Sequence, residues 1–148
     1  MIKKEQVISL ILEACPSFQQ ELNRSNDKDL LYVVMGDLAR HLLGLYRNGQ
    51  TREFSALAEV IEQFHLDGDQ YVKGLAIIGF LEGIQNVWGR DGEDPELFSP
   101  FLLPESRKWW QELNDFWQGK IEHIGDGLQN RNPDGIRQPA NGSPKPSV

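Results

Sequence analysis

Three side chains with acid–base chemistry lie close together within one apolar stretch. That stretch reads VVMGDLARHLLGLY, and it contains Asp37, Arg40 and His41. On a helix, residues three and four positions apart share a face, so Asp37 can reach both Arg40 and His41. Catalysis would also need a nucleophile, a metal or a substrate pocket beside them. We favour an ion pair within the helix at the edge of a core, and we expect no catalytic residues.

The segment HLDGD comes nearest to a metal-ligand pattern, with His65, Asp67 and Asp69. An EF-hand places oxygen ligands at alternate positions of a twelve-residue loop that ends in Glu. The corresponding end position, counted from Asp67, is Ile78, so the spacing fails. The chain has one cysteine, Cys15, and no Cys or His pair has zinc spacing. We expect no metal and no cofactor; Asp67 or Asp69 is expected to cap the next helix, and Cys15 to be a small buried side chain.

The balance of charges gives the clearest functional signal. Acidic residues number 22 against 15 basic ones, and the net charge is -7. Such a surface repels nucleic acid and anionic lipid but attracts basic proteins. A run of carboxylates is most often a solvated face, and the alternative is a contact surface for a basic protein, with aromatic anchors. On that alternative, the contact residues are Glu59, Glu62, Asp67, Asp69, Tyr71, Trp88, Asp91, Glu93, Asp94 and Glu96.

Apolar residues recurring at three and four spacing predict a chain built from helices. The expected helices cover about 3–14, 17–23, 27–47, 51–65, 70–88 and 105–121, with a short turn at 95–102. No stretch has the period-2 alternation of a strand. The fold is therefore expected to be all-α: an irregular antiparallel bundle or a short α-solenoid of about five to seven helices. Ser17 is a plausible N-cap for the second helix, and Trp110 is expected to be partly exposed on the last one.

Glycines in the fifth expected helix predict close packing. Gly74, Gly79 and Gly83 all fall inside it, and each costs roughly 1 kcal/mol of helix stability against alanine. We interpret them as the place where a neighbouring helix approaches closely.

Composition divides the chain into two parts. Residues 1–122 are expected to form a single helical domain, and residues 123–148, rich in Pro, Gly and Asn, a flexible tail. No apolar stretch approaches the ~20 residues of a membrane span. A single cysteine fits a reducing compartment, so we place the protein in the cytoplasm. The oligomeric state is left open.

Several segments together resemble a known group of proteins. They read ACPSF, LLYVVMGDLARHLL, FSALAEVIE, GDQYVKGLAIIGFLEGIQNV and PESRKWW, and they lie between about residues 10 and 113. The succession resembles a family of small bacterial all-helical proteins associated with toxin immunity, including contact-dependent growth inhibition. The resemblance implies binding and neutralisation of a cognate toxin C-terminal domain. It carries over no functional residues, because its motifs are apolar patterns and turns.

The acidic charge suits that implication, because the clefts of nuclease toxins are basic. An acidic immunity protein could occupy such a cleft or its margin and associate quickly. Two rival hypotheses remain. The first is a non-catalytic helical scaffold or adaptor for another protein, which an upstream toxin gene would argue against. The second, least favoured, is an enzyme that uses Asp37, Arg40 and His41.

Overall fold

The computed structural model describes residues 1–119, and within them the fold is all-α, as the sequence predicts. The predicted tail at 123–148 lies outside the described residues. The α-helices are α1 (Val7–Ala14), α2 (Gln19–Arg24), α3 (Leu31–Arg47), α4 (Phe54–Asp67), α5 (Gln70–Gly74), α6 (Glu82–Arg90) and α7 (Pro104–Trp117). Shorter turns are η1 (Lys4–Gln6), η2 (Pro16–Phe18), the π-helical η3 (Leu75–Leu81), η4 (Pro95–Leu97) and η5 (Ser99–Phe101).

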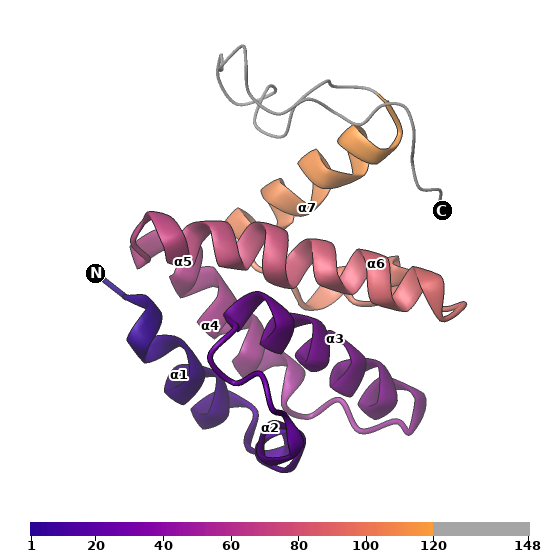
Figure 1. Cartoon of the computed structure of the whole chain (residues 1–148). Helices are drawn as coiled ribbons and strands as arrows, with labels where there is room; N and C mark the ends of the chain where they lie inside the picture. Colours follow the sequence, from indigo (N-terminus) through magenta and orange to yellow (C-terminus); the bar gives the residue numbers. More distant parts are fainter. Residues whose placement is uncertain (120–148) are drawn as a thin grey trace.

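Helix α3 and the long helix formed by α5, η3 and α6 lie side by side at the centre (Figure 1). They run in the same direction, since Tyr32 meets Tyr71 at one end and Arg47 meets Glu93 at the other. The predicted close packing is confirmed at Gly79, where a Cβ atom would lie 3.0 Å from Cγ of Met35. A side chain there would force the two helices apart.

Helix α4 runs antiparallel to α1. Near one end of the pair, the backbone of Ile2 bonds to Asp67 and Asp69, at 2.8 and 2.9 Å. At the other end, Cys15 lies beside Glu53. Cys15 itself is fully buried, which confirms the prediction for it. These contacts fix the N-terminal segment along α4 and against the α4–α5 joint.

Helix α7 closes the far side of the molecule and packs against α4 and η3 (Figure 1). Trp110 is only 2% exposed, so the prediction of partial exposure is wrong. Its Nε1 donates to Glu96, because the segment after α6 folds back over the helix. The helix ends at Trp117 rather than near residue 121, because Gly119 takes a positive φ of 80°. Glycine accepts that conformation without strain and ends helices for this reason.

The core is one cluster of buried side chains to which every α-helix contributes; α5 supplies Val72 alone. Its aromatic centre is Phe98, whose ring meets Phe54, Phe80 and Trp88 at centroid distances of 5.5 to 5.8 Å. Trp88 is fully buried, and its Nε1 donates to the Ala39 carbonyl at 3.1 Å. Among residues 1–119, no helix has both the length and the apolarity to cross a membrane.

Candidate functional site

The three residues in the apolar stretch of α3 divide into two separate interactions. Asp37 and Arg40 form an ion pair within the helix at 2.6 Å, as the sequence predicts. His41 does not join them, and its Nε2 lies 2.8 Å from Oγ of Ser17 in η2. The spacing of Asp37 and His41 would allow a contact, but none is formed, because the His41 side chain points toward η2 instead.

His41 belongs to a hydrogen-bond network that the sequence did not indicate. The Glu53 carboxylate accepts from the hydroxyl of Ser17 at 2.5 Å and from the thiol of Cys15 at 3.1 Å. Since the single hydroxyl proton of Ser17 goes to Glu53, His41 donates its Nε2–H to Ser17. Ser17 therefore caps no helix: α2 begins at Gln19, and the predicted N-cap is wrong. The network joins η2, α3 and the turn before α4.

Ionisation in this network follows from burial and from these bonds. Burial raises the pKa of Cys15 to about 12, and its bond to Glu53 adds to the effect. Burial opposes the charged form of Glu53, but the bonds from Ser17 and Cys15 outweigh it and lower its pKa. Burial lowers the pKa of His41, against the pull of Glu21 and Glu53. Glu53 thus carries the charge, and Cys15 and His41 stay neutral near pH 7.

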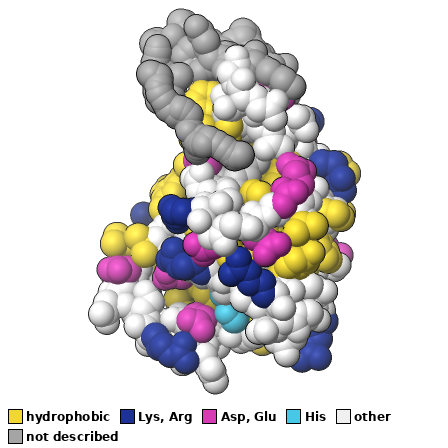
Figure 2. Space-filling view, turned by 90° about the vertical axis from the view of Figure 1, so that its right-hand side faces the viewer, with side chains coloured by type: hydrophobic (Ala, Val, Ile, Leu, Met, Phe, Trp, Pro, Cys, Tyr) yellow, Lys and Arg dark blue, Asp and Glu magenta, His cyan; other side chains and the backbone are white. Residues whose placement is uncertain are grey.

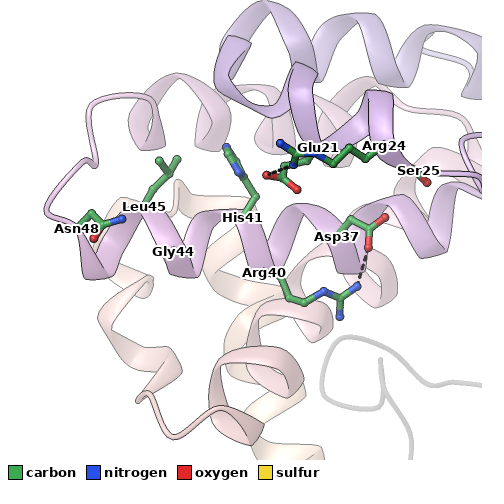
Figure 3. A pocket seen from close by; sticks show the side chains of 9 residues that line it. All are labelled: Glu21, Arg24, Ser25, Asp37, Arg40, His41, Gly44, Leu45 and Asn48. Atoms are coloured by element: carbon green, nitrogen blue, oxygen red, sulfur yellow. Dashed lines mark hydrogen bonds and ion pairs between the residues drawn. The ribbon is translucent and has the colours of Figure 1, made fainter.

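A pocket of about 550 Å³ opens beside His41, between α2 and α3 (Figure 3). Its charged walls are two ion pairs, Glu21–Arg24 at 3.0 Å and Asp37–Arg40 at 2.6 Å. The lining residues are Glu21, Arg24, Ser25, Asp37, Arg40, His41, Gly44, Leu45 and Asn48.

The polar groups in and around this pocket already form hydrogen bonds and ion pairs within the protein, and this limits the chemistry that they could perform. Ser17, the hydroxyl nearest His41, gives its proton to a carboxylate rather than to the imidazole. His41 Nε2 is then a donor and cannot accept the proton of a nucleophile. The two ion pairs also leave no excess of either sign. We interpret this hydrogen-bond network as structural: it fixes η2 against α3 and against the residues before α4.

Two of the predicted contact residues are inside the protein, so those two predictions are wrong. Trp88 is fully buried in the aromatic core. Glu62 is 7% exposed and binds the start of α7: it accepts from the backbone N–H groups of Glu105 and Ser106 at 2.8 and 3.0 Å. It also accepts from the Ser106 hydroxyl at 2.9 Å. Glu62 is therefore a helix cap supplied by another helix, in the place of the first-turn acceptor that α7 lacks.

The environment of Glu62 includes a buried histidine. Burial opposes the charge of Glu62, but its three bonds to Glu105 and Ser106 lower its pKa. His65, one turn along α4, is 6% exposed, and neither of its ring nitrogens has a hydrogen-bond partner. Burial lowers the pKa of His65 to about 4 despite nearby Glu62 and Glu105. His65 is therefore neutral at pH 7. Among residues 1–119, no three or more His, Cys, Asp or Glu side chains are grouped so that they could hold a metal ion.

The remaining predicted residues do not form one surface. Asp67, Asp69 and Tyr71 lie at the start of the long helix, and the acidic loop at 91–96 follows its other end. A helix rises 1.5 Å per residue, so these two groups are about 30 Å apart. Glu59 is exposed on α4, before Asp67. The structure thus separates what the sequence suggested as one contact zone.

Within the loop at 91–96, most carboxylates are bound to the protein itself. Glu93 pairs with Arg47 at 3.2 Å. Asp94 accepts from the backbone of Glu96 and caps η4, at 3.0 Å. Glu96 accepts from Trp110 Nε1 and from Asn114, both at 2.9 Å. Asp91 is the one residue of this loop whose carboxylate has no hydrogen bond or ion pair, while its carbonyl accepts from Arg47.

Charges of both signs are mixed on the face at the carboxyl ends of α3 and α6. Figure 2 shows Lys or Arg and Asp or Glu side chains interspersed there, with no continuous acidic area. The Arg47–Glu93 ion pair, which follows the end of α3, brings charges of both signs to this end of the two helices. A basic partner would gain little net attraction from such a face.

The α4–α5 joint is different, because acidic and aromatic side chains are exposed together. The Asp67 side chain is 60% exposed and lies 4.0 Å from the terminal ammonium of Met1. Asp69 caps α5 by accepting from Val72 N at 2.9 Å, as predicted. Tyr71 and Tyr32 are 39% and 43% exposed and meet edge to face, with ring centroids 6.0 Å apart. We call Lys4, Tyr32 and Tyr71 the tyrosine surface. Tyr32 was not among the predicted contact residues, although its place outside the apolar stripe of α3 was a usable signal.

The described part of the chain defines a small all-helical protein. Residues 8–118 match the model of the family described as Domain of unknown function (DUF7674). This is well over half of the chain, which therefore belongs to that family. No curated protein and no solved structure matches the chain.

Proposed function

We propose that this protein is an immunity protein, which binds and neutralises a basic toxin domain in the cytoplasm. One observation carries the proposal: on a chain with a net charge of -7, the α4–α5 joint leaves Asp67, at the end of α4, 60% exposed and Tyr71, at the start of α5, 39% exposed. An exposed carboxylate next to a half-exposed aromatic ring combines steering with a site for apolar burial. The resemblance of the sequence to immunity proteins supports the same conclusion.

The mechanism we infer is occlusion without chemistry. A nuclease toxin carries a basic cleft for phosphates, and an acidic protein competes for the same charges. Attraction between the two net charges speeds the encounter, and burial of aromatic side chains slows dissociation. The rigid pair of α3 and the long helix would keep the contact surface preorganised, so little ordering entropy is lost on binding.

The test is a neutralisation assay in cells. The toxin C-terminal domain encoded next to this protein in its native genome is expressed under tight control in a bacterial host, with and without this chain. We expect growth arrest without the chain, recovery with it, and a stable complex by gel filtration. Absence of both recovery and complex would reject the proposal.

The alternative, a non-catalytic scaffold or adaptor, is separated by the same assay. A complex with a neighbouring protein that is not toxic on its own would favour the adaptor. The mixed charges in Figure 2 suit that alternative, because a face with alternating signs fits a partner of either net charge.

A further inference from the structure

The tyrosine surface has a feature that no other exposed part of residues 1–119 shares. The ammonium of Lys4 lies over the ring of Tyr71, with Nζ 5.7 Å from the ring centroid. A cation over an aromatic face is attracted by the ring quadrupole, by about 0.5 to 1 kcal/mol at an exposed site. Tyr71 is therefore already shown to accept a cation in this structure, and the cation comes from this chain.

The position of Tyr71 makes its ring available. Tyr32 packs edge-on against it, so the ring is held in orientation while its face stays open to Lys4. Behind the pair, Gly74 leaves room for Tyr32: a Cβ there would lie 3.4 Å from the Tyr32 hydroxyl. The Tyr71 ring is therefore held on a helix in a fixed orientation, and it forms a preorganised binding site for a cation.

Two carboxylates, those of Asp67 and Asp69, lie in the chain segment just before Tyr71. The backbone of Asp67 and Asp69 brackets Ile2, two residues before Lys4. The Asp67 carboxylate is largely exposed, while one oxygen of Asp69 is used to cap α5. The charges of Asp67 and Asp69, four and two positions before Tyr71, favour a cation over an anion at this end of the long helix.

We propose that the tyrosine surface is the docking site for an arginine or lysine side chain of the basic protein partner, which displaces Lys4 from the Tyr71 ring. This inference rests on the proposed function for the identity of the partner. Lys4 is the internal occupant that keeps the site filled in the free protein. The Lys4 side chain is exposed, and its contact with the ring is worth only about 0.5 to 1 kcal/mol, so it can rotate away at small cost while Ile2 and Gln6 keep the segment in place.

The first experiment uses the protein alone and a defined probe, the peptide amide Gly-Arg-Gly. NMR signals of the Tyr71 ring and of the Lys4 ε-methylene are followed during titration. We expect the Tyr71 signals to shift as the peptide binds. The Lys4 signals should move toward free-lysine values, because the arginine of the peptide displaces the Lys4 side chain from the ring. The matched peptide Gly-Glu-Gly should cause neither change.

Variants separate this site from general attraction. Lys4→Met removes the internal occupant, so the peptide should bind about threefold more tightly. In Tyr71→Leu, the peptide should no longer change the Lys4 signals. Lys73→Met is the control, because it removes the same charge on α5 away from the Lys4–Tyr71 contact. Thermal unfolding confirms that each variant is folded. Equal gains for Lys4→Met and Lys73→Met would overturn the proposal.

The second experiment keeps this inference separate from the proposed function. With a toxin partner in hand, Tyr71→Leu should speed dissociation at least tenfold, while Leu97→Ala, an exposed change on η4, should not. Unchanged dissociation for Tyr71→Leu overturns the docking site and leaves immunity intact. Peptide binding at Tyr71 with no neutralised toxin supports the site and rejects immunity.

Discussion

The carboxylates near the two ends of the long helix differ in how far they are bound to the rest of the protein. At the end that leads into residues 91–96, Glu93, Asp94 and Glu96 bind Arg47, the start of η4 and Trp110. At the α4–α5 joint, the Asp67 side chain is 60% exposed, and its ion-pair partner is the terminal ammonium of Met1 at 4.0 Å. The difference teaches that a carboxylate counts toward a binding surface only if the fold has not already used it. Net charge therefore overstates the acidic area that a partner can contact.

The largest effect we expect is from removing a carboxylate that holds the fold. Glu62→Ala leaves three donors at the start of α7 without their acceptor, two of them on buried Ser106. We expect the free energy of unfolding to fall by about 3 kcal/mol in urea denaturation. The control is Glu59→Ala, on the exposed side of the same helix, which should change it by less than about 0.5 kcal/mol. Equal losses would contradict the assignment of Glu62 as a cap.

Acid should destabilise the protein through His65. Its pKa is about 4 in the folded state, below the ordinary value of 6.5, so the unfolded chain binds the proton first as pH falls. Stability is complete above about pH 6.5 and is lost progressively toward pH 4, by on the order of 3 kcal/mol. His65→Leu should remove this part of the pH dependence, measured as urea midpoints between pH 7 and 4. Glu53 and Glu62, whose pKa values are lowered, add losses only at more acidic pH.

A smaller effect is expected from the acidic loop at 91–96. Glu96→Ala removes the acceptor of Trp110 Nε1 and of Asn114. Because Glu96 is itself exposed, water can replace part of the loss, and we expect a decrease of about 1 kcal/mol. The decrease in the free energy of unfolding is measured by Trp fluorescence during urea denaturation. Asp91→Ala, in the same loop, serves as the control and should have no measurable effect.

The smallest effect on stability belongs to the α4–α5 joint. Asp67→Lys should change the free energy of unfolding by less than about 0.5 kcal/mol, since the side chain is largely exposed. It should nevertheless slow association with the partner several-fold at low salt, and the effect should fade as salt is added. Stopped-flow association rates measure this. If Asp91→Lys slowed association equally, steering would not be specific to the joint, and the contrast between the two ends would be lost.

Prediction from the sequence succeeded where interactions are local. The helices, the Asp69 cap and the Asp37–Arg40 pair all depend on residues within four positions of one another. Spacing along the chain fixes such contacts once a helix forms. The close approach at Gly79 was also readable, because glycine inside a helix is costly unless a neighbour needs the space.

The tertiary structure alone decided which carboxylates are available and which side chains share a site. Glu53 reaches Ser17 and Glu62 reaches Ser106 across 36 and 44 positions of the chain. No local pattern encodes those pairings, because they depend on how helices pack against one another. By itself, the sequence determined an acidic all-helical protein. Packing determined that Glu62 and Trp88 are internal and that Tyr32, Tyr71 and Asp67 lie at the exposed α4–α5 end.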